Sequence, residues 1–153
     1  MAKDELVQHF LVSWKICNNH TISFVDKIPT NLWHKKPFDP YYKTFAWEFA
    51  YIARTRECYI RGLETGELRF EEAEDIPNID KLERMPKKKI LELLQKQARK
   101  IGKLINRNKN LWMIAWLLQH ERLHHGKLIL YFSKAKLKYP SSFMETWGKS
   151  NFE

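Results

Sequence analysis

The placement of prolines most constrains how this chain of 153 residues can fold. The six prolines are Pro29, Pro37, Pro40, Pro77, Pro86 and Pro140. Because proline is excluded from helix interiors, these positions, together with a short polar turn at 108–110, delimit four long segments. In each segment apolar residues recur at intervals of three and four, the period of an amphipathic helix. The sequence therefore predicts helices over about residues 4–27, 41–63, 87–107 and 111–137.

Four long helices without any strand-like alternation are typical of a four-helix bundle. A chain of this length commonly folds as one domain, so we expect a single all-α domain over residues 1–153. The connection at 108–110 is very short, and the last two helices are therefore expected to be antiparallel neighbours. The other two connections are long enough to cross the bundle.

The cysteines and the N-terminal segment bear on the compartment. Cys17 and Cys58 are far apart and belong to no CxxC pair, which favours a reducing environment. The first residues include Asp4 and Glu5 and lack the apolar stretch of a secretory signal. The longest apolar run covers 111–118, whereas a membrane span needs roughly 20 residues. We therefore expect a soluble cytoplasmic protein that does not enter the membrane.

Positive charge is concentrated in one predicted helix. Residues 80–109 carry eleven basic and three acidic side chains, a local +8 within a net charge of +9. The basic stripe of this helix comprises Lys96, Lys100, Lys103 and Arg107. Such a stripe can bind phosphate groups, so nucleic acid or another acidic partner is one interpretation. The other is the solvated face of an amphipathic helix, which is favoured because no aromatic residue interleaves the stripe to stack a base.

Two histidines in the last predicted helix are the main candidates for a metal site. His120 and His124 are four residues apart and therefore share one helix face. Their spacing formally matches HExxH, in which Glu121 would act as a general base beside the metal. Alternatively, each imidazole is a core or cleft side chain bonded to Glu48, Tyr51 or a backbone carbonyl. The spacing leaves both interpretations open.

The segment from His120 to Leu128, followed by Tyr131 and Phe132, resembles the last helix of the DinB/YfiT-like family. The signature of that family is a histidine, a second histidine four residues later, then a basic and glycine-containing step and an apolar run. Residues 24–29, 36–37 and 47–52 are similar, in the same order, to the end of the first helix, the entry to the second helix and a segment within it. The similarity extends over most of the chain, and the histidine segment is its specific part.

The resemblance implies an up-down-down-up four-helix bundle with long crossover connections, often a homodimer. It also implies a divalent metal, zinc or nickel, held by three histidines. His120 and His124 match the two ligands of the last helix. The resemblance therefore implies that the HExxH match is a coincidence and that Glu121 need not be a general base. Characterised relatives include thiol-dependent transferases, isomerases and metal-dependent hydrolases, so the resemblance implies a metal-dependent enzyme with a small-molecule substrate.

This chain departs from the family at the third ligand. The histidine of the second helix is replaced by Tyr51, and a phenol with a pKa near 10 is a poor ligand at neutral pH. Glu48, His9 and His20 are the other candidates for a third ligand. A site changed in this way would hold its metal loosely or would have lost it, and in that case a non-catalytic binding module or a structural dimer would be the alternative.

Overall fold

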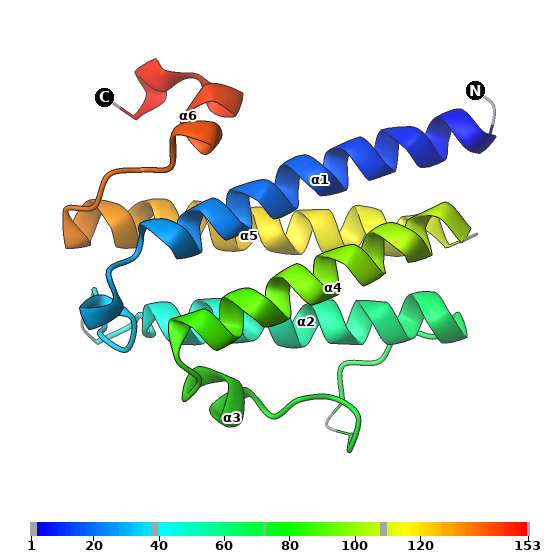
Figure 1. The fold of residues 1–153 in the computed structure, drawn as a ribbon, viewed down its shortest axis with the longest axis horizontal. Helices are drawn as coiled ribbons and strands as arrows, with labels where there is room; N and C mark the ends of the chain where they lie inside the picture. Colours follow the sequence, from blue (N-terminus) through cyan, green and yellow to red (C-terminus); the bar gives the residue numbers. More distant parts are fainter. Residues whose placement is uncertain (1–2, 38–39, 72, 108–109, 153) are drawn as a thin grey trace.

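The computed structural model describes residues 3–37, 40–71, 73–107 and 110–152, and all regular secondary structure within these ranges is helical (Figure 1). The prediction of an all-α protein is therefore confirmed. The helices, in chain order, are α1 (Lys3–Lys27), the 3₁₀ turn η1 (Thr30–Leu32), α2 (Phe45–Thr65), α3 (Ile79–Glu83), α4 (Lys87–Arg107), α5 (Leu111–Ala135), α6 (Ser141–Trp147) and the 3₁₀ turn η2 (Lys149–Asn151).

The ends of the long helices follow local signals in the sequence. Helix α4 has the bounds predicted for it, directly after Pro86, and α1 and α5 differ by only a few residues. Helix α2 begins at Phe45, four residues later than predicted, because Thr44 is its N-cap: the Thr44 hydroxyl accepts a hydrogen bond from the backbone N–H of Trp47 at 3.0 Å. The short helices α3 and α6 were not predicted.

The four long helices run in two opposite directions. Helices α1 and α5 run in one direction, and α2 and α4 run in the other (Figure 1). Both α4 and α5 pack mainly on α1 and α2 rather than on each other. The prediction that the last two helices are antiparallel is correct, but the prediction that they are neighbours along their length is wrong. A connection of a few residues constrains only the two helix ends that it joins.

The core consists of two apolar clusters at different heights along the helices. One cluster includes Phe24, Phe49, Ile52, Leu94, Leu128 and Phe132, and the other includes Trp14, Tyr59, Ile101, Met113, Ile114 and Leu117. On each long helix, buried polar residues lie between the two clusters. These are Thr21 on α1, Arg56 on α2, Gln97 on α4, and Glu121 and His125 on α5. Apart from Glu48, which is buried beside the first cluster, the core is therefore apolar at both ends and polar in the middle.

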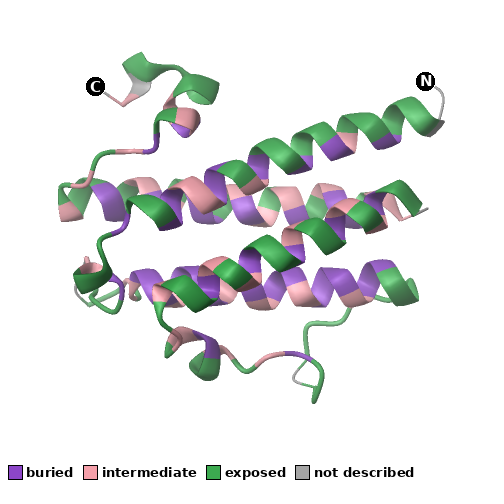
Figure 2. Ribbon diagram, viewed as in Figure 1, coloured by how far each residue is buried: buried purple, intermediate pink, exposed green. Residues whose placement is uncertain are grey.

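Burial differs among the helices. Helix α2 is buried along most of its length, whereas one side of α4 is exposed (Figure 2). Helix α6 packs against α1, where Ser142 bonds to Ser23 and Thr146 to His20, toward the C-terminal end of α1. None of the helices in the described ranges is long and apolar enough to cross a membrane.

Candidate functional site

The imidazoles of His120 and His124 face each other on the side of α5 that meets α2. Their Nε2 atoms are 3.2 Å apart. His124 is buried and His120 is half-buried. Burial and the neighbouring His124 lower the pKa of His120 to about 4, so this imidazole is neutral at pH 7, which is the form that binds metals. The two residues that the i,i+4 spacing places on one face are therefore in direct contact, with their Nε2 atoms at hydrogen-bond distance.

The buried carboxylate of Glu48 forms a hydrogen bond with the Nδ1 side of the His124 ring. The Nδ1–H of His124 donates to Oε2 of Glu48 at 2.6 Å, and the other carboxylate oxygen accepts from the Tyr131 hydroxyl and the Lys127 ammonium, each at 2.8 Å. Burial alone would raise the pKa of Glu48, but the hydrogen bonds from His124 and Lys127 outweigh it and leave this pKa below its ordinary value. Because Nδ1 of His124 faces Glu48, its Nε2 atom faces His120.

The His120 side of the pair borders a pocket of about 520 Å³. Its walls are largely aromatic and apolar, with Tyr51, Tyr59, Phe70, Trp116 and Leu123 among them, and Thr55, Gln119 and His120 supply polar atoms. This volume is within the usual range for small-molecule sites. The Thr55 hydroxyl is 3.4 Å from His120 Nε2. The Nδ1 atom of His120 is buried and has no hydrogen-bond partner among the described residues.

The candidates for a third metal ligand lie in different places. The ring of Tyr51 packs over both imidazoles, with centroid distances of 5.7 and 5.5 Å. Glu48 lies on the Nδ1 side of His124, so it orients this ring and does not share the space between the Nε2 atoms. His9 is exposed beside Glu5, and His20 is bonded to Arg122 and Thr146. Tyr51 is thus the candidate that faces the pair.

Glu121 lies on a different face of α5 and is fully buried against Arg56. The Arg56 guanidinium donates to both carboxylate oxygens, at 2.5 and 2.9 Å. Burial would raise the pKa of Glu121, but the charge of Arg56 and hydrogen bonds from Arg56 and Thr21 hold it below its ordinary value. This geometry agrees with the interpretation of HExxH as coincidental, because Glu121 is engaged in an ion pair and not directed at the histidine pair.

The burial of Arg56 against Glu121 was not predicted from the sequence. The Arg56 guanidinium also donates to the Asn18 side chain at 3.0 Å and to the Leu94 carbonyl at 2.8 Å, and it stacks on Trp14 at 4.8 Å from the ring centroid. A signal was present, because Arg56 is four residues after Ile52 and three before Tyr59 on the buried stripe of α2. A charged residue on an apolar stripe predicts a buried partner.

A second group of potential ligands adjoins this ion pair. In the described part of the chain, Cys17, Glu121 and His125 form a buried group whose ligand atoms lie within 4.8 Å of one another, so they could hold a metal ion. Burial and Glu121 raise the pKa of Cys17 to about 12, which keeps it a thiol, whereas a metal ligand must be a thiolate. The positive charge of Arg56 on Glu121 also disfavours a cation there.

The basic stripe is exposed on α4. Lys96, Lys100, Lys103 and Arg107 all have exposed side chains, and Lys100 pairs with Glu64 at 2.7 Å. The four residues do lie on the solvated side of the helix, opposite the buried Leu94, Ile101 and Ile105. Binding of nucleic acid by this stripe stays a prediction.

Comparison with known proteins adds no identity. No protein-family model and no curated protein matches this chain.

Proposed function

We propose that His120 and His124 bind one divalent cation, zinc or nickel, and that the chain is a metal-dependent enzyme, a hydrolase or a thiol-dependent transferase, of the DinB/YfiT-like type. The observation that carries this proposal is the 3.2 Å between the two Nε2 atoms. Two imidazoles on one tetrahedral zinc, at Zn–N distances of about 2.0–2.1 Å, place their nitrogens about 3.3 Å apart. The donor pair therefore fits a cation without any change in spacing.

The surroundings of the pair support a catalytic rather than a structural site. Structural zinc sites have four protein ligands, whereas catalytic sites keep an open position. Here His120 borders a pocket of about 520 Å³, and Glu48 accepts from Nδ1 of His124, the carboxylate–histidine arrangement that orients metal ligands. A bound cation would supply polarisation of a substrate carbonyl or activation of water or a thiol.

The residues of the chain have separable roles in this proposal. Glu48 fixes the ring orientation of His124, and Lys127 and Tyr131 hold Glu48. The rings and apolar side chains of the pocket exclude water from the substrate. Thr55 and Gln119 offer polar contacts at the pocket wall. Tyr51, packed over both imidazoles, restricts the size of any substrate that reaches them.

Metal content measured by inductively coupled plasma mass spectrometry tests the proposal. Protein without an affinity tag, dialysed against zinc or nickel and then against buffer, is expected to retain about one equivalent. The His120→Ala/His124→Ala variant is expected to retain none, because both imidazole ligands are removed. Calorimetric titration of the same proteins with each metal gives the affinity.

A Cys17→Ala variant is the matched control, because it removes a ligand from the other buried group. It is expected to bind metal as the wild type does. Loss of metal in Cys17→Ala with retention in the histidine variant would move the site to Cys17, Glu121 and His125. Background metal in all three proteins would refute the metalloenzyme. Thiol-transfer and hydrolysis assays follow if the wild type retains metal and the His120→Ala/His124→Ala variant does not.

We also propose an up-down-down-up four-helix bundle and a homodimer in the cytoplasm, as the family resemblance implies. The opposite directions of the helix pairs α1, α5 and α2, α4 support the bundle. The exposed face of α5 supports the dimer, because it presents large apolar side chains within one narrow angular range: Trp112, Trp116, Leu123 and Leu130. Exposed apolar patches of this kind mark interaction surfaces.

Sedimentation equilibrium tests the dimer. The wild type is expected at twice the chain mass of 18.5 kDa, and the Trp112→Lys/Leu130→Lys variant at the chain mass, because two charges would be buried in the interface. Val12→Lys/Ile16→Lys is the control, since these exposed apolar residues lie on α1. A wild type that stays at the chain mass at every concentration would contradict the dimer.

A further inference from the structure

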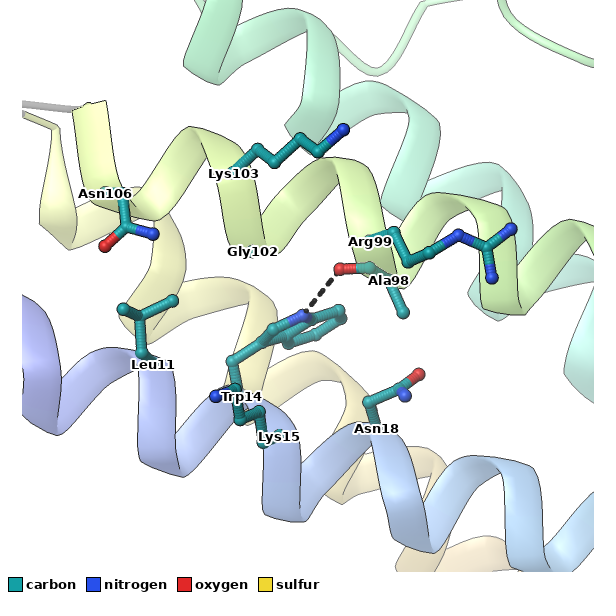
Figure 3. A pocket seen from close by; sticks show the side chains of 9 residues that line it. All are labelled: Leu11, Trp14, Lys15, Asn18, Ala98, Arg99, Gly102, Lys103 and Asn106. Carbon is teal, nitrogen blue, oxygen red and sulfur yellow. Dashed lines mark hydrogen bonds between the residues drawn. The ribbon is translucent and has the colours of Figure 1, made fainter.

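A second pocket opens on the opposite side of the core from the histidine pair. It has a volume of about 430 Å³ and lies between α1 and α4 (Figure 3). No residue that lines it also lines the pocket beside His120. It is therefore a separate cavity, and the proposed metal chemistry makes no use of it.

The floor of this pocket is a fixed aromatic ring. Trp14 is 2% exposed, and its indole N–H donates to the Ala98 carbonyl at 3.2 Å (Figure 3). The Arg56 guanidinium lies over the ring at 4.8 Å from its centroid. Two contacts thus hold the indole in place, and with Leu11 and Ala98 it forms a preorganised apolar surface.

A glycine leaves the pocket open on the α4 side. Gly102 is inside a helix, where glycine is less favourable than alanine. A Cβ built there meets no atom within 4 Å, so the local packing does not require glycine. The missing side chain instead leaves space beside Trp14.

The rim of the pocket is positively charged. Lys15, Arg99 and Lys103 line it, and no aspartate or glutamate is among the lining residues. The charged ends of Arg99 and Lys103 extend outward from α4, while Asn106 on α4 and Asn18 on α1 lie toward opposite ends of the pocket (Figure 3). None of the three cationic side chains forms an ion pair within the described part of the chain.

We propose that this pocket binds a small anion with an apolar or aromatic body, such as an aromatic phosphate, carboxylate or sulfonate. The body would fill the space beside Gly102, which Leu11 and Ala98 also border, because removal of apolar surface from water favours binding. The anionic group would lie at the rim, within reach of Lys15, Arg99 and Lys103. Lys103 would then bind one localised anion rather than form part of a continuous nucleic-acid surface.

Titration with 8-anilinonaphthalene-1-sulfonate tests the proposal, because this fluorescent probe combines an aromatic body with one sulfonate. The wild type is expected to bind at one principal site. Gly102→Leu is expected to weaken binding at least tenfold, because its side chain fills the pocket. Gly126→Leu is the matched control and should leave binding unchanged, since a Cβ at this helical position also meets nothing within 4 Å.

Charge is tested with two variants of equal net charge. Lys15→Gln/Arg99→Gln/Lys103→Gln is expected to weaken binding at least tenfold. The second variant is Lys96→Gln/Lys100→Gln/Arg107→Gln, which removes three charges of α4 that do not line the pocket. It is expected to change the affinity for the probe less than threefold. Equal weakening by both variants would show unspecific attraction and overturn the proposal, as would a Gly102→Leu variant that binds like the wild type.

Competition shows whether both parts of the ligand are needed. Phenyl phosphate is expected to displace the probe at concentrations at least tenfold lower than inorganic phosphate or benzyl alcohol. Displacement by benzyl alcohol as readily as by phenyl phosphate would overturn the anionic assignment. Circular dichroism of each variant checks that it is folded.

Discussion

Replacing Arg56 by methionine is expected to lower the free energy of unfolding by about 3–5 kcal/mol, because Glu121 would remain as a buried charge without its partner. Both side chains are 0% exposed, and two hydrogen bonds join them. The loss also includes the contact of Arg56 with Trp14. Urea unfolding at pH 7, followed by circular dichroism, measures the difference.

Two further variants define what the loss means. Arg54→Met removes an arginine of the same helix whose guanidinium makes an exposed hydrogen bond to the Phe70 carbonyl, and it is expected to cost less than about 1 kcal/mol. Arg56→Met/Glu121→Leu removes both charges and is expected to recover most of the loss, as when apolar residues replace a buried ion pair. A cost of Arg56→Met no larger than that of Arg54→Met would contradict the buried pair.

Acidification from pH 7.5 to 5.0 is expected to remove about 2 kcal/mol of stability through His125 alone, with the metal chelated. Burial, with the positive charge of Arg122 adding to it, lowers the pKa of His125 from 6.5 to about 3 although Glu121 acts in the opposite direction. The unfolded chain therefore binds a proton below pH 6.5 that the folded chain does not. Stability is full above pH 6.5 and falls as the pH decreases toward 3.

The comparison of wild type with His125→Asn isolates this effect. Urea unfolding at pH 7.5 and 5.0 is expected to show a difference between the two pH values that is smaller by about 2 kcal/mol in the variant. Glu121, whose pKa is lowered below the ordinary carboxyl value, stays ionised throughout this range and does not contribute. In the folded protein, the two ring nitrogens of His125 contact Thr21 and Arg122, and we expect these contacts to disfavour protonation. The same pH dependence of stability in both proteins would contradict this expectation.

The long helices follow local patterns of proline and apolar residues, and therefore their approximate bounds could be predicted from the sequence. Proline at 86 and the apolar period of residues 87–107 are sufficient for α4. The helices α3 and α6 are too short to show a period, and they form because Leu82 and Phe143 are buried against the core. The lateral order of the helices was not predictable from connection length, because it depends on contacts between distant segments.

The candidate site was predictable only in part for the same reason. The i,i+4 spacing indicates that His120 and His124 share a face, and the apolar stripe indicates that this face is inward. That Glu48 would bond Nδ1 rather than approach Nε2 depends on the distance between α2 and α5, which no local pattern encodes. The burial of Arg56 could be predicted from its place on the apolar stripe. Its partner Glu121, 65 residues away, could not.

Arg56 links all four long helices: it belongs to α2, and its guanidinium donates to Asn18 on α1, Leu94 on α4 and Glu121 on α5. This has a consequence for the order of assembly during folding. An intermediate that lacked α5 would bury Arg56 without a counter-charge, and one that lacked α2 would bury Glu121 in the same way, each at a cost of several kcal/mol. Partly assembled forms are therefore unstable, and the chain is expected to fold and unfold in a single cooperative step.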